Sequence, residues 1–238
     1  MHPRLADLTL VGLAPLLVAQ GRRVRRDTPR LPEPPGDRQG TRGEGTPLSL
    51  LILGDSAAAG VGAPSQDTAL LGQLVDRLSG QHRVTWQLVA RTGMTTTDAR
   101  EALFQGEHVG RAWDIVVVSL GVNDATRLMR SGRFRRHTEA LLTRIQRELM
   151  PGVVVLSGLP PLHRFPALPE PLRSVIGARA RRLDRALSAI AAQRGPSVVY
   201  LKLPFVELDA EAMASDGFHP GPPVYAAWAT QVLAAIDR

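Results

Sequence analysis

The chain has 238 residues, of which 44% are hydrophobic and 21% charged, and its formal net charge is +7. This length suits one compact domain with a core and a cleft. Because the chain contains no cysteine, a disulfide framework, a cysteine nucleophile, a thiolate zinc site and an iron–sulfur cluster are all excluded. Lys202 is the only lysine among 29 basic residues, and it does not belong to a Gly-Lys-Ser/Thr phosphate loop. Aromatic residues make up 4% of the chain and offer few surfaces for stacking bases, so we expect no nucleic-acid partner.

Residues 1–46 differ in composition from the rest and are predicted to form an N-terminal tail and linker, followed by one domain over residues 47–238. The apolar run Leu8–Ala19 is shorter than the ~18–20 residues that a membrane-spanning helix needs. The cluster of arginines at residues 22–26 follows this run rather than precedes it, which disfavours a removed secretory signal, and we expect the protein in the cytoplasm. Two alternatives stay open for this tail: a peripheral membrane contact through residues 5–26, or a helix packed on the domain.

From residue 48 onward, short apolar runs alternate with longer segments of helical period, a pattern typical of βαβ units around a parallel sheet. Five strands are predicted, at Leu48–Leu53, Val84–Val89, Asp114–Leu120, Val153–Ser157 and Val198–Leu203. Helices are predicted at about residues 67–79, 96–104, 133–149, 171–193 and 222–236. The expected fold is therefore α/β, a three-layer α/β/α sandwich with a five-stranded parallel sheet.

Polar residues follow the carboxyl ends of the predicted strands, where open sheets of this type bind ligands. Ser56 follows the first strand, and a serine becomes a good nucleophile when an imidazole takes its proton. His219 follows the fifth strand along the chain, and Asp216 precedes it by three residues, a spacing at which the carboxylate can orient the imidazole. These residues predict acyl-transfer chemistry, with Ser56, Asp216 and His219 as the catalytic residues.

Three hydrogen-bond donors are candidates for stabilising the oxyanion of such a reaction. They are the backbone N–H groups of Ser56 and Gly93 and the side-chain amide of Asn123. Gly93 follows the second predicted strand and Asn123 the third, so both are expected at the same edge of the sheet as Ser56. Asp55 and Asp124 are interpreted as residues that brace the loops.

The segment 48–236 resembles the SGNH hydrolases, also called GDSL-type esterases and lipases, in the order and spacing of its motifs. Gly54-Asp55-Ser56 resembles the nucleophile motif, Gly93 the glycine of the second motif, Gly121-x-Asn123-Asp124 the third and Asp216-x-x-His219 the last. Ala57 departs from the family, which commonly has a larger apolar residue there, and the chain has no Gly-x-Ser-x-Gly elbow. The resemblance implies a flavodoxin-like SGNH hydrolase fold and hydrolysis of a carboxylic ester through an acyl-enzyme on Ser56, with no cofactor. The scattered histidines predict no metal site.

The loop after the fourth predicted strand carries the substrate prediction, because its apolar residues Leu162, Phe165 and Leu168 are placed to line an acyl pocket. Together with the apolar tail, this loop favours a lipid-like or medium acyl ester, such as a lysophospholipid, over an acetylated sugar. Two alternatives stay open: an acyltransferase of the same fold, and a non-catalytic binding module for membrane surfaces.

Overall fold

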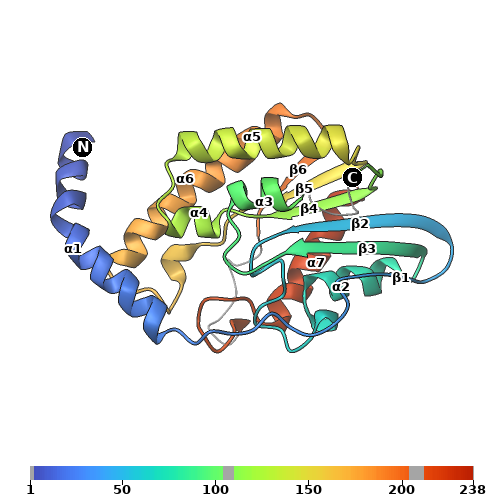
Figure 1. The fold of residues 1–238 in the computed structure, drawn as a ribbon, viewed down its shortest axis with the longest axis horizontal. Helices are drawn as coiled ribbons and strands as arrows, with labels where there is room; N and C mark the ends of the chain where they lie inside the picture. The colour runs from blue at the N-terminus through green and yellow to red at the C-terminus, as the bar shows by residue number, and fades with distance from the viewer. Residues whose placement is uncertain (1–2, 104–109, 204–211, 238) are drawn as a thin grey trace.

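The computed structural model describes residues 3–103, 110–203 and 212–237, with side chains from residue 12 onward. It forms a three-layer α/β/α sandwich around one sheet (Figure 1). The strands are β1 (Gln39–Arg42), β2 (Thr46–Gly54), β3 (His82–Ala90), β4 (Ile115–Ser119), β5 (Val153–Ser157) and β6 (Val198–Leu201). Their order in the sheet is β1-β3-β2-β4-β5-β6, and β1 is antiparallel to β3 whereas the other neighbouring pairs are parallel. The α/β class is confirmed.

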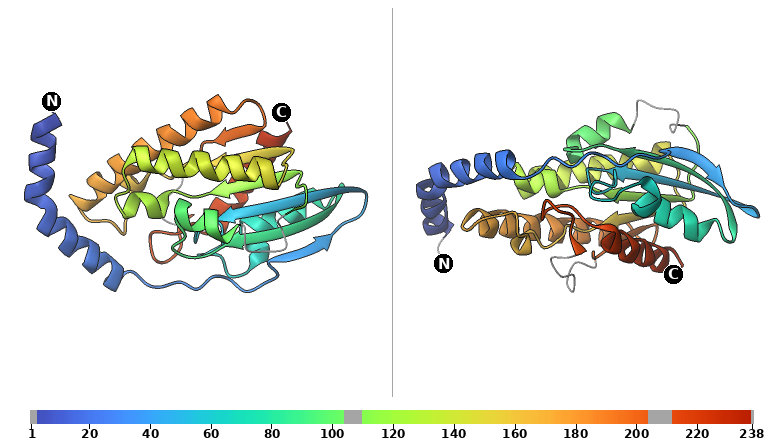
Figure 2. Two further views of the ribbon diagram at one scale, coloured as in Figure 1. Left: turned by 45° about the horizontal axis from the view of Figure 1, so that its top comes forward. Right: turned by 90° about the horizontal axis from the view of Figure 1, so that it is seen from below.

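Helices cover both faces of this sheet (Figure 2). They are α1 (Pro3–Asp27), α2 (Leu70–Leu78), α3 (Thr96–Ala102), α4 (Val122–Thr126), α5 (Ser131–Glu148), α6 (Leu172–Gln193) and α7 (Pro222–Ile236), with 3-10 turns at Gln66–Thr68 and Leu162–Arg164. The predicted helices agree with α2, α3, α5, α6 and α7 to within a few residues. Residue 104, the predicted end of the second helix, lies outside the described residues. The short helix α4 is absent from the sequence-based prediction.

The apolar runs of the central strands are buried on both faces, which is why they read as continuous hydrophobic stretches. Successive side chains of β2 alternate between the two faces. Leu51 and Leu53 belong to the core cluster shared with α3, α5 and α6, whereas Leu50 and Ile52 belong to the cluster shared with α2 and α7. All four are fully buried, so the strand is held in register from both sides.

The sheet has a sixth strand, so the expectation of five parallel strands is wrong on this point. The additional strand β1 comes from the predicted linker and pairs antiparallel with β3 at the edge of the sheet. Its sequence is Gln-Gly-Thr-Arg, with mostly exposed side chains, and it therefore lacks the apolar alternation from which a strand is recognised. Gly40 lies against the Trp86 ring, where a Cβ would be 2.6 Å from a ring carbon. Glycine thus lets this short strand cover the edge of β3.

The helix α1 extends beyond one end of the sheet and bends along its length, and Pro15 within it accounts for a bend (Figures 1 and 2). Its second half contacts the body of the protein. Leu17 and Val24 pack against the core. The Gln20 side chain bonds twice at the start of α6, donating to Glu170 O at 2.7 Å and accepting from Leu172 N at 3.2 Å. The side chains of residues 5–11, part of the predicted membrane contact, lie outside the described residues. Within the described part of the chain, no helix combines the length and the apolar character needed to cross a bilayer.

Candidate active site

The strand order places a crevice beside β2, because the chain passes from β2 to β3 on one side and reaches β4 on the other. Ser56 lies in this crevice, two residues after the end of β2. Gly54 is packed so tightly that a Cβ there would be 2.4 Å from the Ala58 Cβ and 2.5 Å from the Ser119 carbonyl oxygen. Asp55 N donates to the same oxygen of Ser119 at 3.1 Å. Glycine is therefore required at the turn that brings the serine to the edge of the sheet.

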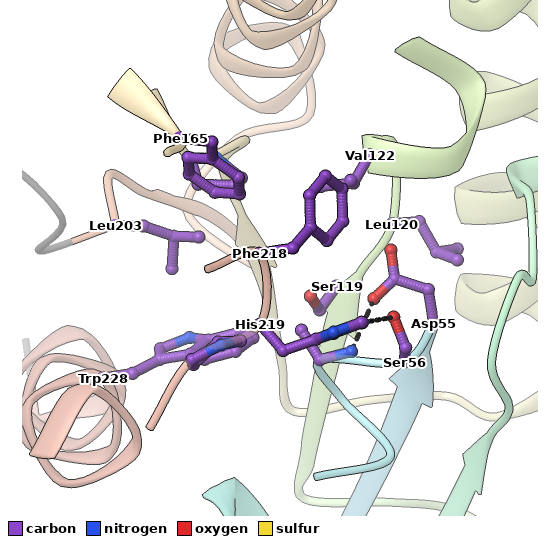
Figure 3. A pocket seen from close by; sticks show the side chains of 14 residues that line it. Asp55, Ser56, Ser119, Leu120, Val122, Phe165, Leu203, Phe218, His219 and Trp228 are labelled. Carbon is purple, nitrogen blue, oxygen red and sulfur yellow. Dashed lines mark hydrogen bonds between the residues drawn. The ribbon is translucent and has the colours of Figure 1, made fainter. Parts of the chain in front are cut away.

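The structure brings Ser56, His219 and Asp216 together in one hydrogen-bonded chain, of which Figure 3 shows the bond between Ser56 and His219. His219 Nε2 is 2.9 Å from Ser56 Oγ, and His219 Nδ1 is 2.5 Å from Asp216 Oδ2. The His219 side chain is 17% exposed, so it can be reached from the crevice, whereas the carboxyl group of Asp216 is fully buried. An imidazole held between a buried carboxylate and a serine hydroxyl can act as a general base toward that hydroxyl.

Asp216 stays ionised although it is buried. Burial by itself would raise the pKa of this carboxyl group, but hydrogen bonds from the His219 ring and from two backbone N–H groups outweigh it and lower the pKa. The two backbone donors are His219 N at 2.9 Å and Phe218 N at 3.0 Å, both to Oδ1. Oδ1 is thus occupied by the backbone, and Oδ2 remains free to hold the imidazole.

The pKa of the Asp55 carboxyl group is raised, whereas that of Asp216 is lowered. Asp55 is 2% exposed, and its Oδ1 accepts a hydrogen bond from Ala57 N at 3.1 Å. Burial raises the pKa of this carboxyl group to about 7, despite the backbone hydrogen bonds and the nearby His219, which both lower it. Asp55 braces the loop around Ser56, as the sequence predicts. Because its carboxyl group is buried there, the group ionises less readily than an exposed one.

The loop between β3 and α3, residues 91–95, carries Gly93 and is called the Gly93 loop. Hydrogen bonds at three points join this loop and the first residue of α3 to α4 and to Arg127, which directly follows α4. Asn123 Nδ2 donates to Met94 O at 3.0 Å, and Arg127 donates to Gly93 O at 3.1 Å. Thr96 donates to the buried Asp124 Oδ2 through both its backbone N–H at 3.1 Å and its hydroxyl at 3.0 Å.

These bonds join Gly93 and Asn123 in one connected unit, in which the Asn123 amide uses one of its two N–H groups toward Met94 O. Gly93 has a φ of +81°, which few other residues adopt. Asp124 acts here as the brace that the sequence predicts. The sequence analysis does not identify the roles of Arg127 and Thr96, because contacts between a side chain and a distant loop leave no recognisable motif in the sequence.

The catalytic pocket is small and mostly apolar. Its volume is about 30 Å³, and beside Ser56 and His219 it is lined by Val122, Phe165, Leu203, Phe218 and Trp228, among others (Figure 3). Of the three residues predicted to line an acyl pocket, Phe165 lines this one. Leu168 lines a separate groove on the side of α1, and Leu162 is fully buried in the core and lines neither. We therefore leave Leu162 out of the substrate site. Phe218 and Trp228 are missed by the sequence analysis.

Among the described residues, no group of three or more His, Asp or Glu side chains is arranged to hold a metal ion.

Comparison with known proteins agrees with this site. The model of the GDSL-like lipase/acylhydrolase family matches residues 52–227, which include the serine, the Gly93 loop, α4 and the histidine. The chain is 29% identical to the GDSL-like esterase Rv1075c of Mycobacterium tuberculosis over an alignment of 247 positions, which covers 95% of this chain and 77% of that protein.

Solved structures share the fold. A lipase, Lip_vut3, from a goat rumen metagenome is similar with a TM-score of 0.66 and 18% identity, covering 79% of this chain and 97% of that one. A lipase/acylhydrolase from Enterococcus faecalis is similar with a TM-score of 0.62 and 18% identity, covering 79% of this chain and 95% of that one. The resemblance inferred from the motifs is confirmed by the family match: the chain belongs to the GDSL-like lipase/acylhydrolase family and is a carboxylic ester hydrolase.

Proposed function

We propose that the protein hydrolyses lipid-like or medium acyl esters, a lysophospholipid among them, through an acyl-enzyme on Ser56. The observation that carries this proposal is the chain of hydrogen bonds from Ser56 Oγ through the His219 ring to Asp216, with distances of 2.9 and 2.5 Å. The apolar lining of the adjoining pocket supports an acyl group rather than a sugar as the part of the substrate bound there.

In the first half of the reaction, Ser56 Oγ attacks the ester carbonyl carbon while His219 Nε2 takes the hydroxyl proton. The carbonyl oxygen becomes an oxyanion, for which the Ser56 N–H, the Gly93 N–H and the Asn123 amide are the proposed donors. Asp216 holds Nδ1 and stabilises the imidazolium that forms. The tetrahedral intermediate then collapses, the bond to the alcohol oxygen breaks, and His219 gives its proton to the departing alkoxide.

In the second half, His219 takes a proton from a water molecule that attacks the acyl-enzyme. The second tetrahedral intermediate then collapses, the bond between the acyl carbon and Ser56 Oγ breaks, the carboxylic acid is released, and His219 returns its proton to Ser56 Oγ. An alcohol or amine in place of water would give acyl transfer by the same steps, which is the acyltransferase alternative.

A fluorophosphonate probe tests the nucleophile. We expect the wild type to be labelled and the Ser56→Ala variant to remain unlabelled, with hydrolysis of p-nitrophenyl esters lost in the same variant. Labelling of Ser56→Ala at the wild-type rate would overturn the assignment, and a wild type that does not react would favour the non-catalytic binding module.

An ester panel tests the substrate class. Kinetics with p-nitrophenyl acetate to palmitate, and with lysophosphatidylcholine, should give a kcat/KM that rises with acyl length beyond acetate. Highest activity on acetate and on acetylated xylose would contradict the lipid-like class, and products acylated on an added alcohol would indicate the transferase.

The membrane contact through residues 5–26 remains a prediction. The packing of Leu17 and Val24 on the core supports the alternative in which the second half of α1 belongs to the domain. Partition into anionic liposomes, compared between the full chain and a chain lacking residues 1–27, separates the two: equal partition would retire the membrane contact.

A further inference from the structure

A groove lies on the side of α1, next to the catalytic pocket. Its volume is about 400 Å³, against about 30 Å³ for the pocket at Ser56. Sites for small organic ligands occupy ~300–1,000 Å³, whereas a pocket of about 30 Å³ has room for only one or two water molecules. An acyl chain longer than a few carbons must therefore extend out of the catalytic pocket, and the groove is large enough to receive it.

The groove and the catalytic pocket share Phe218, the residue directly before His219. The Phe218 ring meets the Phe165 ring edge to face, with 5.3 Å between their centroids. Phe165 lines the catalytic pocket, and Leu168, three residues later, lines the groove. The catalytic pocket and the groove thus adjoin at Phe218, and the apolar segment from Phe165 to Leu168 contributes to both.

The far wall of the groove is the second half of α1. Leu17, Val18 and Val24 line it, and the two hydrogen bonds of Gln20 to Glu170 and Leu172, at the start of α6, hold the helix in place. Val18 is 52% exposed, and Leu128 on the opposite side is 45% exposed. Leu128 also has a left-handed backbone with a φ of 56°, a conformation that leucine rarely adopts. Large apolar side chains left in water around one concave surface indicate an apolar ligand.

The charged side chains that line the groove are arginines of α1, and both are exposed at its rim. Arg22 and Arg25 line it from α1, are exposed, and make no ion pair with any residue in the described part of the chain. Arginine covers apolar surface with its aliphatic stem while its guanidinium stays in water. The set therefore favours an aliphatic chain that lies along the arginine stems over a sugar, which needs hydrogen-bonding groups along its length.

We propose that this groove, walled by α1 and entered beside Phe218, binds the aliphatic acyl chain of the substrate, so that α1 sets the acyl-length preference. The inference rests on the proposed function, since it places the ester carbonyl at Ser56. Each methylene group buried in such a site raises kcat/KM about fourfold, so a groove that accepts several of them dominates the choice of substrate.

The test compares Val18→Trp, which fills the groove, with Ala19→Trp, which adds the same ring to an exposed neighbour that does not line it. For Val18→Trp we expect kcat/KM on p-nitrophenyl dodecanoate to fall by about tenfold or more, while that on p-nitrophenyl acetate stays within about twofold of wild type. Ala19→Trp should retain both. Equal kinetics of the two variants on dodecanoate, or equal losses on acetate and dodecanoate in Val18→Trp, would overturn the inference.

A binding measurement separates this inference from the proposed function. Calorimetric titration of the Ser56→Ala protein with dodecanoate needs no turnover. Adding Val18→Trp should weaken dodecanoate binding by about tenfold, and adding Ala19→Trp should not. If the wild type hydrolyses no ester but this difference holds, the proposed function fails and the groove stands. If esters are hydrolysed but the titrations are identical, the groove assignment fails alone.

Discussion

Replacing Asp55 by asparagine is expected to make the stability of the protein less sensitive to alkaline pH. Burial of this carboxyl group raises its pKa to about 7, so the folded state holds the proton more tightly than the unfolded chain does. The stability that this group contributes is therefore fully present below about pH 4, declines as the pH rises, and is lost above about pH 7. Asparagine keeps the oxygen that accepts from Ala57 N at 3.1 Å but cannot ionise.

The size of the stability change follows from the difference between the pKa of Asp55 in the folded state and in the unfolded chain. A pKa of about 7 lies about three pH units above the ordinary carboxyl value, and at ~1.36 kcal/mol per unit the whole effect is about 4 kcal/mol. About 2.5 kcal/mol of it falls between about pH 5 and pH 8, because the unfolded carboxyl group is already mostly ionised at the lower value. For a chain of this length, that corresponds to a Tm difference of about 5–10 °C.

The assay is thermal unfolding of the wild type and Asp55→Asn at the two pH values. Other groups that titrate in this range are common to both proteins, so the change in Tm between the two pH values is compared rather than the Tm itself. The exposed Asp37 supplies the control, since Asp37→Asn removes a carboxyl group from water and should follow the wild type. If Asp55→Asn shows the same pH-dependent change in Tm as the wild type, burial does not oppose ionisation of Asp55 and the reasoning is refuted.

Three further outcomes are expected. Asn123→Ala should lower kcat by ~10²–10³ with little change in KM, and a lower kcat/KM caused by KM alone would argue against its oxyanion role. Asp216→Asn should lower kcat by ~10⁴ at neutral pH, because an amide N–H facing Nδ1 favours the wrong tautomer of His219; activity close to wild type would remove Asp216 from the mechanism. Phe134→Ala should reduce the free energy of unfolding in urea by about 3–5 kcal/mol, because the ring is fully buried, while a loss below about 1 kcal/mol would mean that α5 packs differently.

The parts of the fold that were predictable are those whose pattern reflects burial. The strands β2, β4 and β5 have apolar runs buried on both faces, and α2 and α5 place their buried residues at helical spacing, so alternation of apolar runs and helical periods locates them. The edge strand β1 was not predictable in this way. Its stability comes from pairing with β3 and from the contact of Gly40 with Trp86, and neither partner is near it in the sequence.

The catalytic candidates were accessible for a different reason. Ser56 and His219 follow strands, and the rule that ligands bind at the carboxyl ends of parallel strands brings them to one edge without knowledge of the strand order. Asp216 lies three residues from His219, so its placement is a local matter of turn geometry. The wall of the substrate site is not local: Phe218, Trp228 and the α1 residues reach it through tertiary packing, and apolar residues of this kind look the same in a sequence whether they line a cleft or a core.

The hydrogen bonds between the Gly93 loop and the α4 region show how segments that are distant in sequence form one proposed oxyanion site. Two donors proposed for the oxyanion belong to segments that are separate in sequence, and the bonds of Asn123 to Met94 O and of Arg127 to Gly93 O join them. Asn123 therefore has two proposed tasks, since one amide N–H bonds to Met94 O and the other is the proposed donor to the oxyanion. Arg127→Ala removes a tie without removing a donor, so it should lower kcat by less than Asn123→Ala does. An equal loss in both variants would mean that the loop position, rather than the amide of Asn123, limits stabilisation of the oxyanion.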